Sequence, residues 1–127
     1  MKNIIFIILS ALVLCSCSTC KIAKQSAINE INFGTGGGFT GRVISYSLKS
    51  DGTLLKNDKQ ISKLSCDSLN SILELAEQLP KENLVYPDNT YSFIQIVWSD
   101  TTYNYTWSLG HPLDEKITEL YIKLNKR

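Results

Sequence analysis

The sequence predicts a single α+β domain of two layers, in which an antiparallel sheet of four to five strands carries two helices on one face. Two groups of segments alternate between apolar and polar residues, as half-buried strands do. Each group is followed by a segment whose apolar residues recur at spacings of three and four, as on one side of a helix. The predicted order is strand, strand, short strand, helix, strand, strand, helix. Hairpins joined through helices favour this two-layer arrangement.

The first two strands flank a glycine-rich segment. In residues 28–33, Ile31 and Phe33 lie on one side of the predicted strand, and polar residues lie on the other. Residues 44–49 alternate more clearly. Between the two strands, residues 34–41 contain five of the seven glycines of the chain. We expect this segment to be a flexible loop, because glycine tolerates backbone conformations that other residues avoid.

A short third strand and the first helix follow. Asp51-Gly52 is a turn dipeptide, after which residues 53–56 can return as a strand and residues 57–62 are expected to be loop. Ser65 is a good N-cap, Asp67 places a negative charge in the first turn, and Pro80 ends the helix. The predicted apolar face of this helix consists of Leu69, Ile72, Leu73, Ala76 and Leu79.

The strongest hairpin candidate joins residues 91–98 to residues 102–108, after a ten-residue loop over residues 80–89. With Asp100 and Thr101 as the connection, Trp98 faces Tyr103 and Ile96 faces Tyr105. This register puts the aromatic residues on one side, toward the helices, where they form core. If that face were open instead, Trp98, Tyr103, Tyr105 and Trp107 would form a platform for a sugar or a protein.

The chain closes with a second helix, expected to begin at His111-Pro112, because proline suits the first helical position. Its predicted apolar face consists of Leu113, Ile117, Leu120, Tyr121 and Leu124.

The N-terminal segment has the layout of a secretory signal. Lys2 supplies a positive charge, and the 11 residues from Ile4 to Leu14 are mainly apolar. That run is too short for a membrane-spanning helix, which needs roughly 20 apolar residues. We therefore expect residues 1–16 to be a signal peptide.

Leu14-Cys15-Ser16-Cys17 resembles the lipobox of bacterial lipoproteins. The resemblance implies cleavage after Ser16 and lipid on Cys17, with residues 17–27 as a lipidated tether and residues 28–127 as the domain. The expected location is then the bacterial cell envelope, with the protein lipid-anchored at the outer membrane. The alternative is an ordinary signal peptide that is cleaved to give a soluble product.

Two further cysteines, Cys20 and Cys66, remain in the predicted mature chain. The envelope permits disulfides, so a bridge between them is one alternative. Because Cys20 lies in the tether and two cysteines define no disulfide framework, we expect two unpaired thiols.

Charge and composition favour a non-catalytic role. Without residues 1–16, the 13 basic residues fall to 12 and match the 12 acidic ones, so nothing indicates a nucleic-acid surface. No cluster of His, Cys and carboxylates has metal-ligand spacing, so we expect no metal and no cofactor. His111 is the only histidine, and its position before Pro112 is more typical of the start of a helix than of a catalytic base.

The glycine run also matches nucleotide-binding patterns, in Gly36-Gly37-Gly38-Phe39-Thr40-Gly41-Arg42-Val43. A dinucleotide-binding loop must lead into a helix, whereas a predicted strand follows here. A kinase also needs a catalytic Asp loop and an Asp-Phe-Gly motif, which are absent. Nucleotide binding is therefore not expected.

Two interpretations of the run remain. In one, the glycines meet backbone requirements and Phe39 is a core residue at the start of the second strand. In the other, Gly36, Gly37, Gly38 and Gly41 let the loop enter a partner's cleft, with Phe39 as its apolar anchor.

The run Gly37-Gly38-Phe39-Thr40-Gly41, followed by a helix, an aromatic-rich hairpin and a closing helix, is similar to the emfourin-like family of small bacterial inhibitors of thermolysin-type metallopeptidases. The extra Gly36, the lipid anchor and the longer segment before the first helix depart from the family pattern. The resemblance implies a non-catalytic module that binds a protein partner, in its most specific form a secreted metallopeptidase. The lipobox adds the membrane anchor. The alternative is a structural or assembly component of the envelope with no inhibitory activity.

Overall fold

The computed structural model of the chain describes residue 20 and residues 25–109, 111 and 113–126. Its helices are α3 (Cys66–Glu77) and α4 (Glu115–Asn125). Its strands are β1 (Ile28–Gly37), β2 (Ile44–Lys49), β3 (Thr53–Lys56), β4 (Lys59–Lys63), β5 (Leu84–Tyr86), β6 (Thr90–Trp98) and β7 (Thr102–Ser108).

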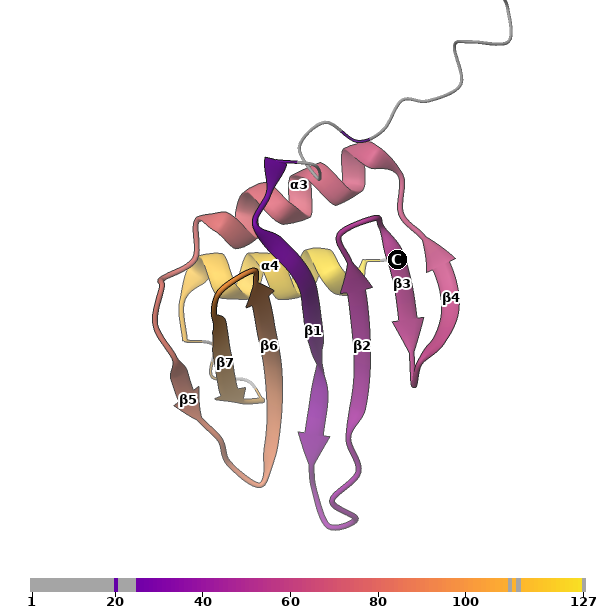
Figure 1. Cartoon of the computed structure of the whole chain (residues 1–127). Coiled ribbons are helices and arrows are strands. Elements are labelled where there is room, and N and C mark those ends of the chain that lie inside the picture. Colours follow the sequence, from indigo (N-terminus) through magenta and orange to yellow (C-terminus); the bar gives the residue numbers. More distant parts are fainter. Residues whose placement is uncertain (1–19, 21–24, 110, 112, 127) are drawn as a thin grey trace, which may run out of the picture.

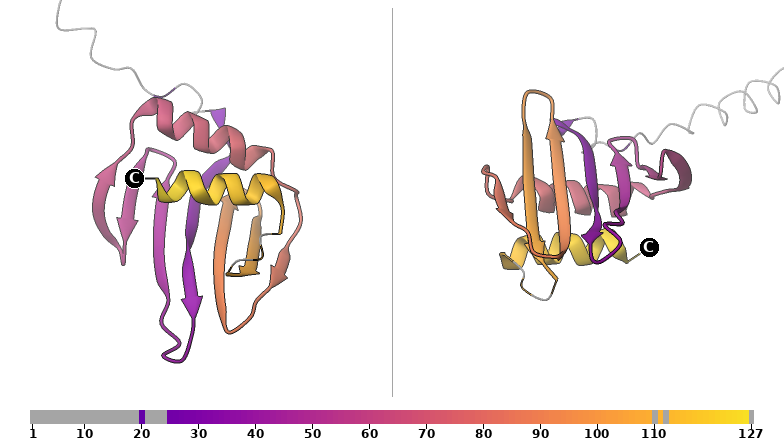
Figure 2. Two further views of the ribbon diagram at one scale, coloured as in Figure 1. Left: turned by 180° about the vertical axis from the view of Figure 1, so that it is seen from behind. Right: turned by 90° about the horizontal axis from the view of Figure 1, so that it is seen from below.

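The strands form one sheet in the order β4-β3-β2-β1-β6-β7-β5, and both helices lie against the same face of it (Figure 1). The view from behind in Figure 2 shows α3 and α4 side by side across the strands. All neighbouring strands are antiparallel except β5, which runs parallel to β7. The α+β class and the two helices on one face agree with the sequence prediction, whereas seven strands exceed the predicted four to five.

The two additional strands lie in segments that we expected to be loops. Asn57 and Asp58 have φ angles of 50° and 62° and form the turn that returns the chain as β4. All five residues of β4 are exposed, so its sequence carries no apolar alternation. Strand β5 has only three residues within the predicted 80–89 loop. Both are edge strands, which need little burial and so leave little pattern.

The core lies between the sheet and the helices, and all of its buried residues fall between Ile28 and Leu124. The predicted apolar face of α3 is buried in full. Ser65 is its N-cap, as predicted, and its hydroxyl accepts a hydrogen bond from the Ser68 amide. In α4, Ile117, Leu120 and Leu124 are buried.

The predicted start of the second helix was wrong. Helix α4 begins at Glu115 with Asp114 as its N-cap, and the Asp114 carboxylate accepts a hydrogen bond from the Lys116 amide. His111 precedes the helix and is exposed. Pro112 lies outside the described residues.

The predicted hairpin is confirmed as β6 and β7, but its register was wrong by two residues. Ile94 pairs with Tyr105 and Ile96 with Tyr103, and the Trp98 amide donates to the Thr101 carbonyl across a loop of Ser99 and Asp100. A shift of two residues leaves every side chain on its predicted face, so the apolar pattern could not exclude it. Tyr105 and Trp107 are buried, and Trp98 and Tyr103 pack against the core, which confirms the core interpretation of the aromatic residues.

The expectation of two unpaired thiols was also wrong, because Cys20 and Cys66 form a disulfide with Cα atoms 5.2 Å apart. The bridge ties the tether to the first residue of α3. In Figure 1 this junction lies at the end of the molecule opposite the β1–β2 hairpin tip. Cys17 and the predicted signal peptide lie outside the described residues. None of the described helices is long and apolar enough to cross a membrane.

Buried Tyr105 links the sheet to the segment after α3, since its hydroxyl donates to the Pro80 carbonyl. Burial, with smaller contributions from Tyr103 and Glu82, raises the pKa of Tyr105 to about 12. A pKa above that of the unfolded chain means that the folded state holds this proton more tightly. The resulting stability is complete below about pH 10 and is lost as the pH rises toward 12 and above.

Tyr105→Phe should therefore lower stability at neutral pH by about 1 kcal/mol, the net value of one hydrogen bond. Between pH 9 and pH 12 the native protein should lose up to about 2–3 kcal/mol of stability through ionisation of Tyr105, and the variant should not show this loss. Urea unfolding of both proteins at several pH values measures the difference. Equal alkaline losses in both proteins would contradict the assignment, and Tyr86→Phe, at an exposed position, is the matched control.

Candidate functional site

The glycine-rich segment is mostly strand rather than loop, which corrects the prediction for residues 34–37. Gly34, Gly36 and Gly37 lie in β1, where Gly34 pairs with both β2 and β6 while Gly36 and Gly37 pair with β6. A Cβ atom on Gly34 would lie 1.9 Å from the Ile44 carbonyl oxygen, and one on Gly37 would lie 1.9 Å from that of Asn89. These glycines are therefore required by the close approach of neighbouring backbone.

The turn itself consists of Gly38, Phe39, Thr40 and Gly41. The Gly41 amide donates to the Gly38 carbonyl at 3.0 Å, which closes the turn. Both glycines have positive φ, 79° and 60°, a region that favours glycine. The Gly38 amide also donates to the Asn89 carbonyl, so the base of the turn is fixed to the loop before β6. The hairpin thus presents its two central residues on a defined support.

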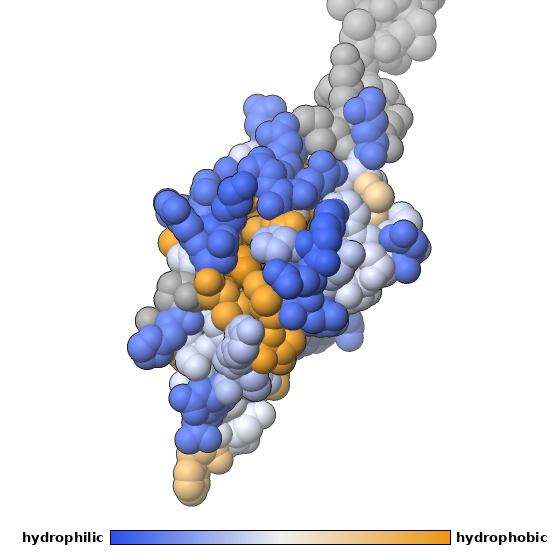
Figure 3. All heavy atoms as spheres, turned by 90° about the vertical axis from the view of Figure 1, so that its left-hand side faces the viewer, coloured by the Kyte–Doolittle hydropathy of each residue, from blue (hydrophilic) through white to orange (hydrophobic). Residues whose placement is uncertain are grey.

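Phe39 is fully exposed, with a relative exposure of 109%, so its interpretation as a core residue was wrong. Val43 and Ile44 on the returning strand are also exposed, at 52% and 44%. We call Phe39, Val43 and Ile44 the apolar tip. In Figure 3, a small group of apolar atoms lies at the lowest end of the molecule, which carries this hairpin, with mostly polar atoms directly above it. Exposed apolar residues that gather in one place mark a contact surface more often than isolated ones do.

Two aromatic residues extend the apolar tip onto the face of the sheet that the helices leave open. Tyr91 and Phe93 of β6 have ring centroids 6.4 Å apart and, with Val43, line a shallow hollow of about 230 Å³. Gly36 pairs with Tyr91, and a Cβ atom on Gly36 would lie 2.5 Å from the Tyr91 hydroxyl. The ring therefore occupies the space that the glycine leaves. The sequence did not predict this neighbourhood, because it depends on the pairing of β1 with β6.

The structure separates the predicted partner-binding residues into two groups. Gly38, Phe39 and Gly41 are exposed together in the turn. Gly36 is buried and Gly37 is half-buried, both within β1. The candidate contact surface is therefore the turn with the apolar tip, and it does not include the backbone of Gly36. Predicted lipidation at Cys17 lies outside the described residues.

The remainder of the open face is mainly polar. Asn32 donates to Gln95 at 3.0 Å, and Gln95 donates to Asn104 at 2.8 Å, so three amides form a row across β1, β6 and β7. Beside it, Lys49 and Glu30 form an ion pair at 2.7 Å. Partial burial would raise the pKa of Glu30, but hydrogen bonds from Lys49 and Ser47 and the Lys49 charge outweigh burial and lower the pKa overall.

Within the described part of the chain, no three His, Cys, Asp or Glu side chains come together in a way that could hold a metal ion. The geometry of the tip provides apolar contact area on a narrow, rigid hairpin, supported on one side by aromatic rings. Such a surface can enter a recess in another molecule.

No protein-family model matches the chain, and no curated protein matches it either.

Proposed function

We propose that the protein is a membrane-anchored envelope lipoprotein that acts as a non-catalytic protein-binding module and uses the apolar tip as its contact. The observation that carries the proposal is the full exposure of Phe39 at the end of the β1–β2 hairpin. Aromatic side chains contribute much of the energy of protein interfaces and are enriched among the residues that dominate binding energy.

The support beneath the ring favours binding rather than mere tolerance of an exposed side chain. Hydrogen bonds from Gly41 to Gly38 and from Gly38 to Asn89 hold the turn in one conformation. A contact residue on a fixed support loses little conformational entropy when it binds. The hairpin also lies at the end of the molecule opposite the Cys20–Cys66 junction (Figure 1), so an anchored domain presents the tip away from its tether.

The most specific form of the proposal is inhibition of a thermolysin-type metallopeptidase. The similarity of Gly37-Gly38-Phe39-Thr40-Gly41 to the emfourin-like pattern supports this choice of partner. Phe39 would enter the pocket that such a peptidase offers to a large apolar residue after the scissile bond. The turn would then block the cleft without being cleaved productively.

Phe39→Ala is expected to weaken inhibition of thermolysin by about 2 kcal/mol, or roughly 30-fold in the inhibition constant, a magnitude typical of a hot-spot residue. Titration of thermolysin with the purified domain measures the constant and the stoichiometry. Ile61→Ala, which removes a half-exposed apolar side chain from β4, is the matched control and should leave the constant unchanged.

The broader proposal has its own test, a photo-crosslinking residue in place of Phe39 in the full-length protein in its own envelope. One discrete protein adduct, absent when the same residue replaces Ile61, would support a partner at the tip. Absence of inhibition together with a discrete adduct would reject the peptidase and keep the binding module. Absence of both would reject the proposal.

A further inference from the structure

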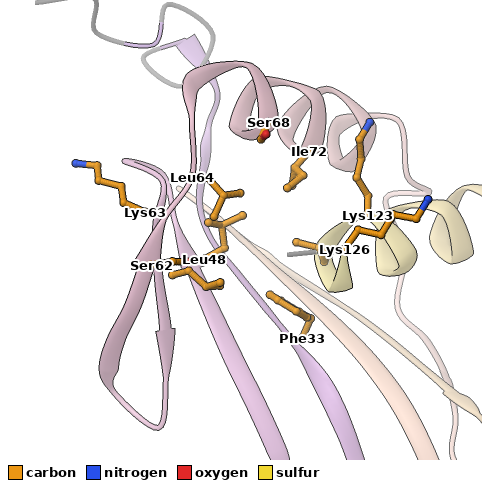
Figure 4. A pocket seen from close by; sticks show the side chains of 11 residues that line it. Phe33, Leu48, Ser62, Lys63, Leu64, Ser68, Ile72, Lys123 and Lys126 are labelled. Atoms are coloured by element: carbon orange, nitrogen blue, oxygen red, sulfur yellow. The ribbon is translucent and has the colours of Figure 1, made fainter.

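A hollow lies on the helix-covered side of the sheet, where the two helices leave β2 and β3 incompletely covered. Its volume is about 380 Å³, near the lower end of the roughly 300–1,000 Å³ that ligand sites occupy. The end of β4, the first turns of α3 and the last residues of α4 surround it (Figure 4). It is separate from the apolar tip and shares no residue with it.

Apolar side chains make up most of the inner lining of the hollow, together with Ser62 and Ser68. Phe33, Leu48 and Leu54, from three adjacent strands, lie beneath it as part of the core, and each is at most 2% exposed. Ile72 of α3 and Leu124 of α4 form its walls. Because these apolar side chains offer no polar atom, the part of a ligand that lies against them must be apolar.

The rim carries positive charge. Lys63 lies at the end of β4, Lys123 lies in the last turn of α4 and Lys126 follows it, and none of the described residues that line the hollow carries a carboxylate. Among the described residues, the one ion pair within bonding distance is Lys49 with Glu30, so none of these three lysines has a carboxylate partner there. Lys123 donates to the Ser71 hydroxyl.

The charge of Lys63 acts on the carboxylate of Asp51, which does not line the hollow. Hydrogen bonds from Thr53 are the main reason that the pKa of Asp51 is lowered, and the charge of Lys63 contributes to it. In Figure 4 the ammonium groups of Lys63, Lys123 and Lys126 all point away from the hollow, and only the stems of Lys123 and Lys126 lie beside it. Long lysine side chains can place their ammonium over an apolar site while their stems cover it. Because the lysine stem is flexible, rotation of these side chains could bring their ammonium groups toward a negative charge at the mouth.

We propose that this hollow binds an aliphatic carboxylate of the fatty-acid class, with its chain over Phe33, Leu48 and Leu54 and its carboxylate among the lysines. The apolar interior selects the chain and the lysine rim selects the anion. Within one chemical series, affinity should rise about fourfold per added methylene until the hollow is full.

The test is calorimetric titration of residues 18–127, with the disulfide intact, using octanoate, decanoate and dodecanoate below their micelle concentrations. This chain contains every buried core residue, so it retains the folding unit. We expect saturable one-to-one binding that tightens along the series. Dodecyltrimethylammonium, which has the same chain with a positive head, should bind at least tenfold more weakly than dodecanoate.

Two variants assign the site. Lys63→Glu combined with Lys126→Glu should weaken dodecanoate binding at least tenfold, whereas Lys59→Glu combined with Lys116→Glu, outside the hollow, should not. Ser62→Trp should fill the mouth, and Gln60→Trp, exposed on the same strand and outside the hollow, is its control. Thermal melting checks that each variant folds.

No saturable binding of dodecanoate, equal binding of the cationic probe, or equal effects of the paired variants would each overturn the proposal. None of these results bears on the apolar tip, because Phe39 and the hollow share no residue. Inhibition and carboxylate binding can therefore fail independently.

Discussion

Replacing Gly34 with alanine is expected to lower the free energy of unfolding by about 3 kcal/mol or more, the upper range for overpacking a well-fitted site. The added Cβ atom would lie 1.9 Å from the Ile44 carbonyl oxygen and 2.9 Å from its carbon, distances that real Cβ atoms essentially never show. Both neighbours are backbone of β2, so no side chain can rotate away. The β1–β2 pair must separate locally, which exposes core beneath Phe33.

Gly41→Ala is the matched control within the same glycine run. Gly41 has a φ of 60°, and its Cβ would meet no atom within 4 Å. Only the backbone penalty of about 1–2 kcal/mol then applies. Urea unfolding of the two variants measures the contrast. Similar losses in both would mean that conformational freedom, and not close approach, is the reason for glycine at position 34.

Loss of the Cys20–Cys66 disulfide should have the second large effect. The bridge joins two cysteines with a sequence separation of 46. Closing a loop of that length reduces the conformational entropy of the unfolded chain, which raises the free energy of the unfolded state by about 4 kcal/mol at room temperature. We expect Cys20→Ser combined with Cys66→Ser to reduce the free energy of unfolding by about this amount, measured by urea unfolding.

A reducing agent should reproduce this loss in the native chain and have no effect on the double variant. Full stability in the reduced native chain would contradict a structural role for the bridge. The expected loss is a large share of the roughly 5–15 kcal/mol by which domains are stable. If the loss is as large as expected, the domain would be most stable in an oxidising compartment, where disulfides persist.

Periodicity predicted the parts of the fold that bury apolar side chains. In α3 the spacing of Leu69, Ile72 and Leu73 marked the buried face, and in β6 the alternation of Ile94 and Ile96 did the same. Features that bury little were missed. Strand β4 is exposed throughout, and β5 has three residues, so neither has a pattern that distinguishes it from a loop.

Pairings between distant segments were also beyond the sequence. The disulfide needs Cys20 beside the first turn of α3, and the hairpin register needs the turn geometry at Ser99 and Asp100. An apolar pattern fixes which face a residue occupies but not which neighbour it meets.

For the candidate site, the sequence located the segment but misassigned its parts. Strands and loops both accept glycine, so the run alone could not show that Gly36 lies in β1 under Tyr91 while Gly38 lies in the turn. The position of Phe39 next to a predicted strand was compatible with core and with solvent. Its exposure follows from the extra length of β1, which carries the turn beyond the helices (Figure 2).

That length has a consequence for an anchored protein. Strand β1 begins beside the tether, at Ile28, and its ten residues end at Gly37, just before the turn. At about 3.4 Å per residue, the strand spans roughly 30 Å. Pairing with β6 extends from Ile28 to Gly37, and pairing with β2 covers Glu30 to Thr35, so the strand is held in its extended form. With lipid on Cys17, as proposed, the length of β1 fixes the distance between the tether and Phe39. Phe39 would then contact a partner at that distance from the tether, and it would not reach a recess that lies nearer the lipid surface.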